Sequence, residues 1–179
     1  ELHAIINSPC FKLFKRSVVT DNNIRFDTNT SFGEDHLFSL QYVMHIHTAD
    51  YSTAQGYIYR VSVGESLTRR NLPLDEVNYY TTTVRRYHDD ILKYVESNLL
   101  ENVFTWRYYD NIVRAIKTSL GNRYTNLDFS ETIKLYRKQY KSYPLPKNYF
   151  KINTILFLWV CFKLPIWLSY RILKLIKKR

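Results

Sequence analysis

The stretch from residue 8 to residue 38 decides the fold of this chain, and its sections read Ser8-Pro-Cys-Phe-Lys-Leu-Phe-Lys-Arg16, Asn22-Asn-Ile-Arg-Phe26 and Ser31-Phe-Gly-Glu-Asp-His-Leu-Phe38. Ser31 followed three residues later by Glu34 is a capping-box pattern, so we expect a helix to begin here. The dipole and free N–H groups of its first turn favour an ionised carboxylate, which keeps Asp35 able to accept a proton near neutral pH. The same pattern opens many helices without a catalytic role, so spacing alone leaves both interpretations open.

The linked motifs extend this interpretation. The order Lys-Leu-Phe-Lys-Arg, Asn-Asn-Ile-x-Phe and Gly-Glu-Asp resembles the acceptor-side half of bacterial family 2 glycosyltransferases. The resemblance implies an α/β fragment, mostly α, that forms the C-terminal part of a GT-A (Rossmann-like) domain followed by a helical extension. It makes Asp35 the catalytic base with Glu34 beside it, and Lys12 and Arg16 candidate substrate-binding residues. The chain departs from the family where Pro9-Cys10-Phe11 replaces the usual aromatic, often Trp, ahead of the lysine segment.

A strand is expected at Tyr57–Val61, where β-prone residues alternate after a glycine. In the family, a similar Tyr-x-Tyr-Arg strand and the loop after it border the donor phosphates. The resemblance therefore makes Arg60 and Ser66 candidates for donor or acceptor contacts. An exposed strand residue without a role is the equal alternative for Arg60.

The metal motif of the family, Asp-x-Asp, occurs nowhere in the 179 residues. Asp89 and Asp90 are adjacent, and their position in a helical pattern favours a solvated face over a metal site. The chain begins at Glu1 and its single methionine is Met44. We therefore expect a fragment without the nucleotide-binding half. It would have no metal ligands of its own, and a divalent cation (magnesium or manganese) would bind only with that half.

The composition favours an intracellular, membrane-facing protein. Hydrophobic residues make up 45% and aromatic residues 16% of the chain, which is ample for a core. Cys10 and Cys161 lie far apart, without the spacing of a zinc site or a disulfide framework. The net charge of +10 implies attraction to an anionic partner: phospholipid, nucleotide diphosphate or nucleic acid.

Three helices are expected in the middle of the chain. One begins at Asp75–Glu76, a second carries a face from Trp106 to Leu120 and stops at Gly121, and a third runs from Ser130 to about Ser142. Asp128, with Glu131 three residues later, is expected to open the third helix. Their aromatic stripes are interpreted as helix-packing surface, with sugar stacking as the alternative.

The C-terminal segment is expected to meet a membrane. Residues 152–170 form an apolar run that nearly reaches the length of about 20 needed to span a bilayer, but Lys163 and Pro165 interrupt it. A lysine at the bilayer centre costs about 2.5–3.5 kcal/mol, which favours a helix in the headgroup region over a spanning one. A helix–Pro–helix hairpin that dips into the bilayer is the main variant. On a helix, four apolar residues fall on the side opposite Lys163, Tyr170, Lys174 and Lys177, and they are Trp159, Phe162, Ile166 and Leu173. The expected membrane-contacting residues are two tryptophans and three lysines: Trp159, Trp167, Lys174, Lys177 and Lys178.

Three parts are therefore predicted: a GT-A portion (1–72), a helical extension (73–143) and a membrane-associated tail (144–179). The expected function is inverting transfer of a sugar from a nucleotide-sugar donor to a lipid-linked or polysaccharide hydroxyl, at the cytoplasmic face of the bacterial inner membrane. The alternative is a non-catalytic module that binds an anionic membrane surface. A nucleic-acid partner is not expected, because the charge clusters beside a lipid-like run rather than across a sheet.

Overall fold

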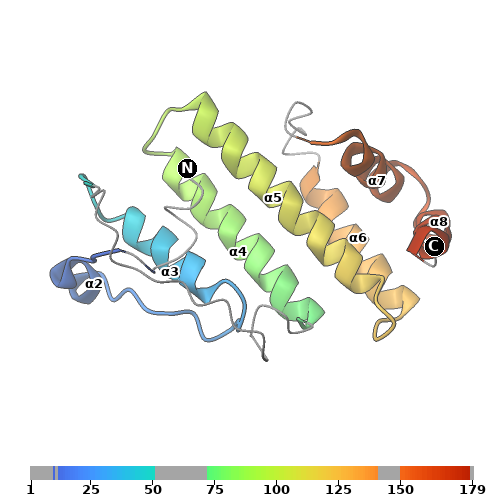
Figure 1. The fold of residues 1–179 in the computed structure, drawn as a ribbon, viewed down its shortest axis with the longest axis horizontal. Coiled ribbons are helices and arrows are strands. Elements are labelled where there is room, and N and C mark those ends of the chain that lie inside the picture. The colour runs from blue at the N-terminus through green and yellow to red at the C-terminus, as the bar shows by residue number, and fades with distance from the viewer. Residues whose placement is uncertain (1–9, 11, 51–71, 141–149, 178–179) are drawn as a thin grey trace. The chain divides into compact units, whose positions relative to one another are not determined.

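The computed structural model describes residues 10, 12–50, 72–140 and 150–177 (Figure 1). The chain divides into two compact units, 1–91 and 92–179. The expected strand Tyr57–Val61, with Arg60 and Ser66, lies outside the described residues, as does Lys178. The predicted division into three parts at residues 72 and 143 stays a prediction.

The first unit contains α2 (Arg16–Asp21), α3 (Glu34–Val43) and α4 (Leu74–Leu92). One hydrophobic cluster of this unit forms where residues 12–16, which we call the basic segment, and the turn after α2 pack on α3. The buried centre of this cluster consists of Ile24, Phe38 and Tyr42, with Phe14, Val18, Val19 and Ile46 packed against it. The Asn-Asn-Ile-x-Phe motif is the turn that ends α2. Asn23 adopts a left-handed φ of 49°, which an asparagine tolerates better than most residues, and this brings Ile24 into the core.

The helix predicted after Ser31 is present, but its capping is different. Glu34 and Asp35 lie in the first turn of α3, as predicted. The N-cap residue, however, is Gly33 in the left-handed conformation, and no side chain caps the helix. The backbone N–H and hydroxyl of Ser31 both donate to Glu76 of α4, at 2.7 and 2.8 Å. The capping-box prediction was wrong because a carboxylate distant in sequence competes for the serine.

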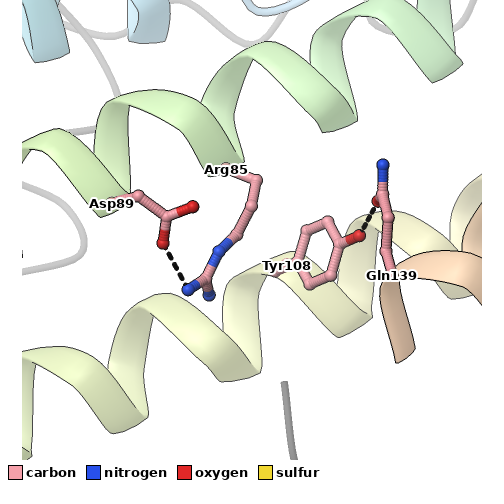
Figure 2. A network of polar contacts seen from close by, with 4 residues as sticks. All are labelled: Arg85, Asp89, Tyr108 and Gln139. Carbon is pink, nitrogen blue, oxygen red and sulfur yellow. Dashed lines mark hydrogen bonds and ion pairs between the residues drawn. The ribbon is translucent and has the colours of Figure 1, made fainter. Parts of the chain in front are cut away.

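The second unit consists of four helices, α5 (Asn98–Ser119), α6 (Asn126–Tyr140), α7 (Ile152–Lys163) and α8 (Ile166–Lys177). Helix α6 packs against α5 on one side and contacts α7 and α8 as well. The core of the second unit contains aromatic residues for which the sequence predicted helix packing, including the fully buried Tyr109 of α5. Tyr108 of α5 donates a hydrogen bond to Gln139 of α6 and so joins the two helices at their interface (Figure 2).

Helix α6 begins four residues earlier than the predicted Ser130. The cause is a capping box that the sequence analysis placed wrongly. Asp128 accepts hydrogen bonds from the backbone N–H and hydroxyl of Thr125 at 2.6 and 2.8 Å, and its own N–H donates to the Thr125 hydroxyl. Asp128 is thus the fourth residue of the box rather than its first, and the helix starts at Asn126.

The C-terminal apolar run forms a helix–Pro–helix arrangement. Leu164 has extended backbone angles and Pro165 follows it, so α7 and α8 are separate helices. Arg137 of α6 holds the break: its guanidinium donates to the carbonyl oxygen of Cys161, at 2.8 and 3.1 Å, and to that of Leu164. Within the described residues, no helix is both long and apolar enough to cross a membrane.

The prediction of a mostly α chain is confirmed. No strand occurs in the part of the chain that the structure describes. These residues therefore give no support for the sheet of a Rossmann-like fragment.

Candidate functional site

The candidate site lies at the N-terminus of α3, where the acidic pair follows a left-handed glycine. Gly33 has a φ of +70°, a backbone conformation that residues other than glycine rarely adopt. A Cβ atom at this position would lie 2.2 Å from Cε2 of Tyr80. The sequence motif therefore needs its glycine for two reasons, the backbone conformation and the ring that packs on it.

Asp35 is the second residue of α3 and is partly exposed. One of its carboxylate oxygens accepts a hydrogen bond from the backbone N–H of His36 at 2.7 Å. Its carbonyl oxygen accepts from the hydroxyl of Ser39 at 3.0 Å, inside the helix. The carboxylate is thus oriented by the backbone of its own turn and is still accessible from outside. A general base that serves a hydroxyl substrate needs both properties.

The basic segment runs along α3 in an extended conformation. Phe14 contacts Phe38 and Tyr42 edge-on, with ring centroids 5.3 and 4.8 Å apart, and the backbone N–H of Lys15 donates to the Tyr42 hydroxyl at 2.8 Å. These contacts fix the direction of the segment relative to the helix. They bring Lys12 to the end of α3 that carries Asp35.

Lys12 and Asp35 interact electrostatically. Partial burial lowers the pKa of the Lys12 amine below its ordinary value, while the thiolate that Cys10 forms at high pH and the carboxylate of Asp35 act in the opposite direction. The structure thus brings together two of the predicted site residues. Arg16, at the start of α2, is exposed to solvent, and Glu34 is partly exposed in the first turn of α3.

One face of α4 supports the acidic turn, and the sequence analysis did not identify it. Glu76 accepts from Ser31, and four residues later the Tyr80 hydroxyl lies 2.7 Å from Nδ1 of His36. Phe32 also contacts the Tyr80 ring, with centroids 4.8 Å apart. The turn is therefore held at the residues before and after the acidic pair. The glycine itself was the available signal, because a glycine before a helix often marks a close approach of another group.

A second polar cluster lies on the same unit, between the turn after α2 and α4. The Tyr79 hydroxyl donates to Asp27 at 2.7 Å, and Asn29 donates to it from its backbone and its side chain at 2.9 Å. Partial burial raises the pKa of Asp27, but these hydrogen bonds and the nearby Arg86 outweigh it, so the pKa lies below its ordinary value. Asp27 is accordingly a charged structural residue rather than a second base.

Asp89, the first residue of the adjacent pair Asp89–Asp90, forms an ion pair on its own helix. Arg85 donates to Asp89 one turn along α4, which is a common helix ion pair (Figure 2). No group of His, Cys, Asp and Glu within the described ranges is arranged to hold a metal ion.

In the second unit, a hollow along α5 is lined by residues of that helix alone: Asp110, Val113, Arg114, Lys117 and Thr118.

Part of this chain is similar to part of a known enzyme. No protein-family model matches the chain, and no solved structure matches it significantly. The chain is 30% identical over 84 residues to the poly(ribitol-phosphate) beta-N-acetylglucosaminyltransferase TarP of Staphylococcus aureus. The alignment covers 46% of this chain and 25% of that relative. The chain therefore contains a region similar to part of a glycosyltransferase.

Proposed function

We propose that this chain forms the acceptor side of a family 2 glycosyltransferase, with Asp35 as the catalytic base. The observation that carries the proposal is the geometry of the acidic turn. A partly exposed carboxylate is fixed at a helix N-terminus, within electrostatic range of Lys12, in the motif for which the resemblance implies this role. The similarity to a staphylococcal glycosyltransferase supports the general class independently.

In the proposed reaction, Asp35 accepts the proton of an acceptor hydroxyl while the oxygen of that hydroxyl attacks the anomeric carbon of a nucleotide-sugar. The bond between this carbon and the diphosphate breaks, and the nucleoside diphosphate leaves with the electron pair. A single displacement of this kind inverts the configuration at the anomeric carbon. The positive end of the helix dipole favours a negative charge in the first turn of α3, which suits a carboxylate base.

Lys12 has a positioning role in this proposal. The charge of Asp35 acts to raise the pKa of the Lys12 amine, although burial has the larger, opposite effect. Its charge favours an anionic substrate, whether the diphosphate of the donor or a phosphate group in the acceptor. Arg16, Arg60 and Ser66 remain proposed substrate contacts. A divalent cation also remains a proposed requirement, and no group of side chains within the described residues is arranged to bind it.

The acceptor is proposed to be a lipid-linked or polymeric glycan hydroxyl. The relative is named as a transferase of N-acetylglucosamine to poly(ribitol phosphate), so this sugar and a polyol-phosphate polymer are the first pair to test. Product formation would be followed by mass spectrometry, with the protein expressed from its complete reading frame and supplied with magnesium or manganese. Transfer from one donor of a nucleotide-sugar panel supports the proposal. A folded protein that transfers no sugar from any donor to any acceptor of the panel contradicts it.

A further inference from the structure

Helices α7 and α8 expose large apolar side chains on the surface of the second unit. Ile152, Leu156 and Trp159 follow each other at intervals of four and three residues, so they lie on one face of α7. Trp159 is 53% exposed, and Trp167 at the start of α8 is 60% exposed. We call these four exposed residues, three on α7 and one on α8, the outer apolar face. They stand in water although the same two helices bury other apolar residues.

The buried residues of these helices face the rest of the unit. Leu158, Cys161 and Phe162 of α7 and Leu173 of α8 are almost fully buried, and both helices contact α6. The sequence analysis placed Phe162 and Leu173 on the same lipid-facing side as Trp159. The structure separates them, because these two side chains supply the packing that attaches α7 and α8 to the unit. The outer apolar face is therefore not needed to hold the helices in place.

Positive charge surrounds this face. Lys151 and Lys163 are exposed at the two ends of α7, and the guanidinium of Arg171 lies over the Trp167 ring, 5.9 Å from its centroid. No Asp or Glu follows Glu131 in the sequence, while residues 132–179 contain twelve Lys and Arg. A partner for this surface must therefore be apolar at its centre and anionic around it.

We propose that the outer apolar face docks on the surface of a bilayer that contains anionic lipid. Each helix has twelve residues and is about 18 Å long, short of the roughly 30 Å of a hydrocarbon core. The extended backbone at Leu164 and the proline after it keep the two helices separate. Trp159 and Trp167 enter the boundary between headgroups and acyl chains, and Lys151, Lys163 and Arg171 meet the lipid phosphates.

The test uses the full chain and vesicles of phosphatidylcholine with or without 30% phosphatidylglycerol, with binding measured by sedimentation and by tryptophan fluorescence. We expect binding to the anionic vesicles, a blue shift of the emission, and weaker binding at 0.5 M salt. Trp159→Ala combined with Trp167→Ala should weaken binding about tenfold or more, because both rings leave water on docking. Lys163→Gln combined with Arg171→Gln should weaken it by about fivefold for each charge removed.

A matched control distinguishes binding by the outer apolar face from nonspecific hydrophobic binding. Leu127 of α6 is 64% exposed in the same unit but lies outside the outer apolar face, so Leu127→Ser should bind the vesicles like the unchanged chain. All variants alter exposed side chains, but the Lys163 ammonium lies 5.6 Å from the centroid of the Tyr140 ring, so circular dichroism checks that each variant keeps its fold and melting temperature. This experiment requires no sugar transfer, so its outcome is independent of the proposed function.

Three outcomes would overturn the proposal. The first is an absence of binding to anionic vesicles by the folded chain. The second is binding that the tryptophan double variant retains in full, since charge alone would then explain it. The third is a stable dimer in light scattering that the same double variant dissociates, because the face would then be covered by a second copy.

Discussion

Replacement of Gly33 by alanine tests the construction of the acidic turn most sharply. The backbone at this residue has a φ of +70°, and a left-handed conformation costs a non-glycine residue about 1–2 kcal/mol. The added Cβ would lie 2.2 Å from Cε2 and 2.8 Å from two further atoms of the Tyr80 ring. Tyr80 is buried, and its hydroxyl is hydrogen-bonded to His36, so the ring moves only if that bond and its packing change. Overpacking of this kind costs about a further 1–3 kcal/mol.

Gly33→Ala should therefore lower the free energy of unfolding of the first unit by about 2–5 kcal/mol. Chemical denaturation followed by circular dichroism measures this loss. Asn23→Ala is the matched control, because Asn23 also has a positive φ but is exposed to solvent. It should cost about 1 kcal/mol or less, the backbone part alone. Equal effects of the two substitutions would refute the close approach of Tyr80.

Three further predictions concern groups whose chemistry the structure sets. Burial raises the pKa of the Cys161 thiol to about 12, whereas Cys10 is exposed. A thiol reagent at pH 8 should therefore modify Cys10 quickly in the native chain and Cys161 only after denaturation. Rapid labelling of both cysteines would contradict the packing of α7. Arg137→Lys should lower the free energy of unfolding of the second unit by about 1–3 kcal/mol in urea denaturation, because an ammonium cannot reproduce the bonds to two carbonyl oxygens; an unchanged denaturation midpoint would show that these bonds do not hold the break between α7 and α8. The pKa of Asp27 is lowered in the folded state, so its contribution to stability is present above the unfolded pKa and is lost as the pH falls through the folded pKa. The difference in melting temperature between the unchanged chain and Asp27→Asn should therefore close below about pH 4. A difference that widens there would refute this assignment of Asp27.

The sequence predicted the helices best where apolar periodicity and a stop signal agreed. Gly121 follows Leu120, the C-cap residue of α5, and its N–H donates to the carbonyl oxygen of Thr118, in agreement with the predicted stop. The start of α6 was missed because two acidic residues in the same segment both fit a capping position. Only the hydrogen bonds of Thr125 with Asp128 decide between the two possible boxes.

The candidate site was partly predictable for a similar physical reason. The position of Asp35 in the first turn of α3 follows from local sequence, and the structure agrees with it. The support from Glu76 and Tyr80 depends on packing between residues more than forty positions apart, which no local pattern encodes. The two faces of α7 could not be told apart either, because both are apolar and the tertiary contacts alone decide which one is buried.

The measurement that tests the central claim most directly is the rate of sugar transfer by Asp35→Asn, compared with Glu34→Gln, in protein expressed from the complete reading frame. Both residues lie in the first turn of α3, so both variants lose one negative charge from the same helix end. Our account predicts that Asp35→Asn lowers kcat by about a hundredfold or more, with an unchanged melting temperature, whereas Glu34→Gln keeps most of the activity. An Asp35→Asn enzyme that transfers sugar at the rate of the unchanged protein would contradict the assignment of Asp35 as the base.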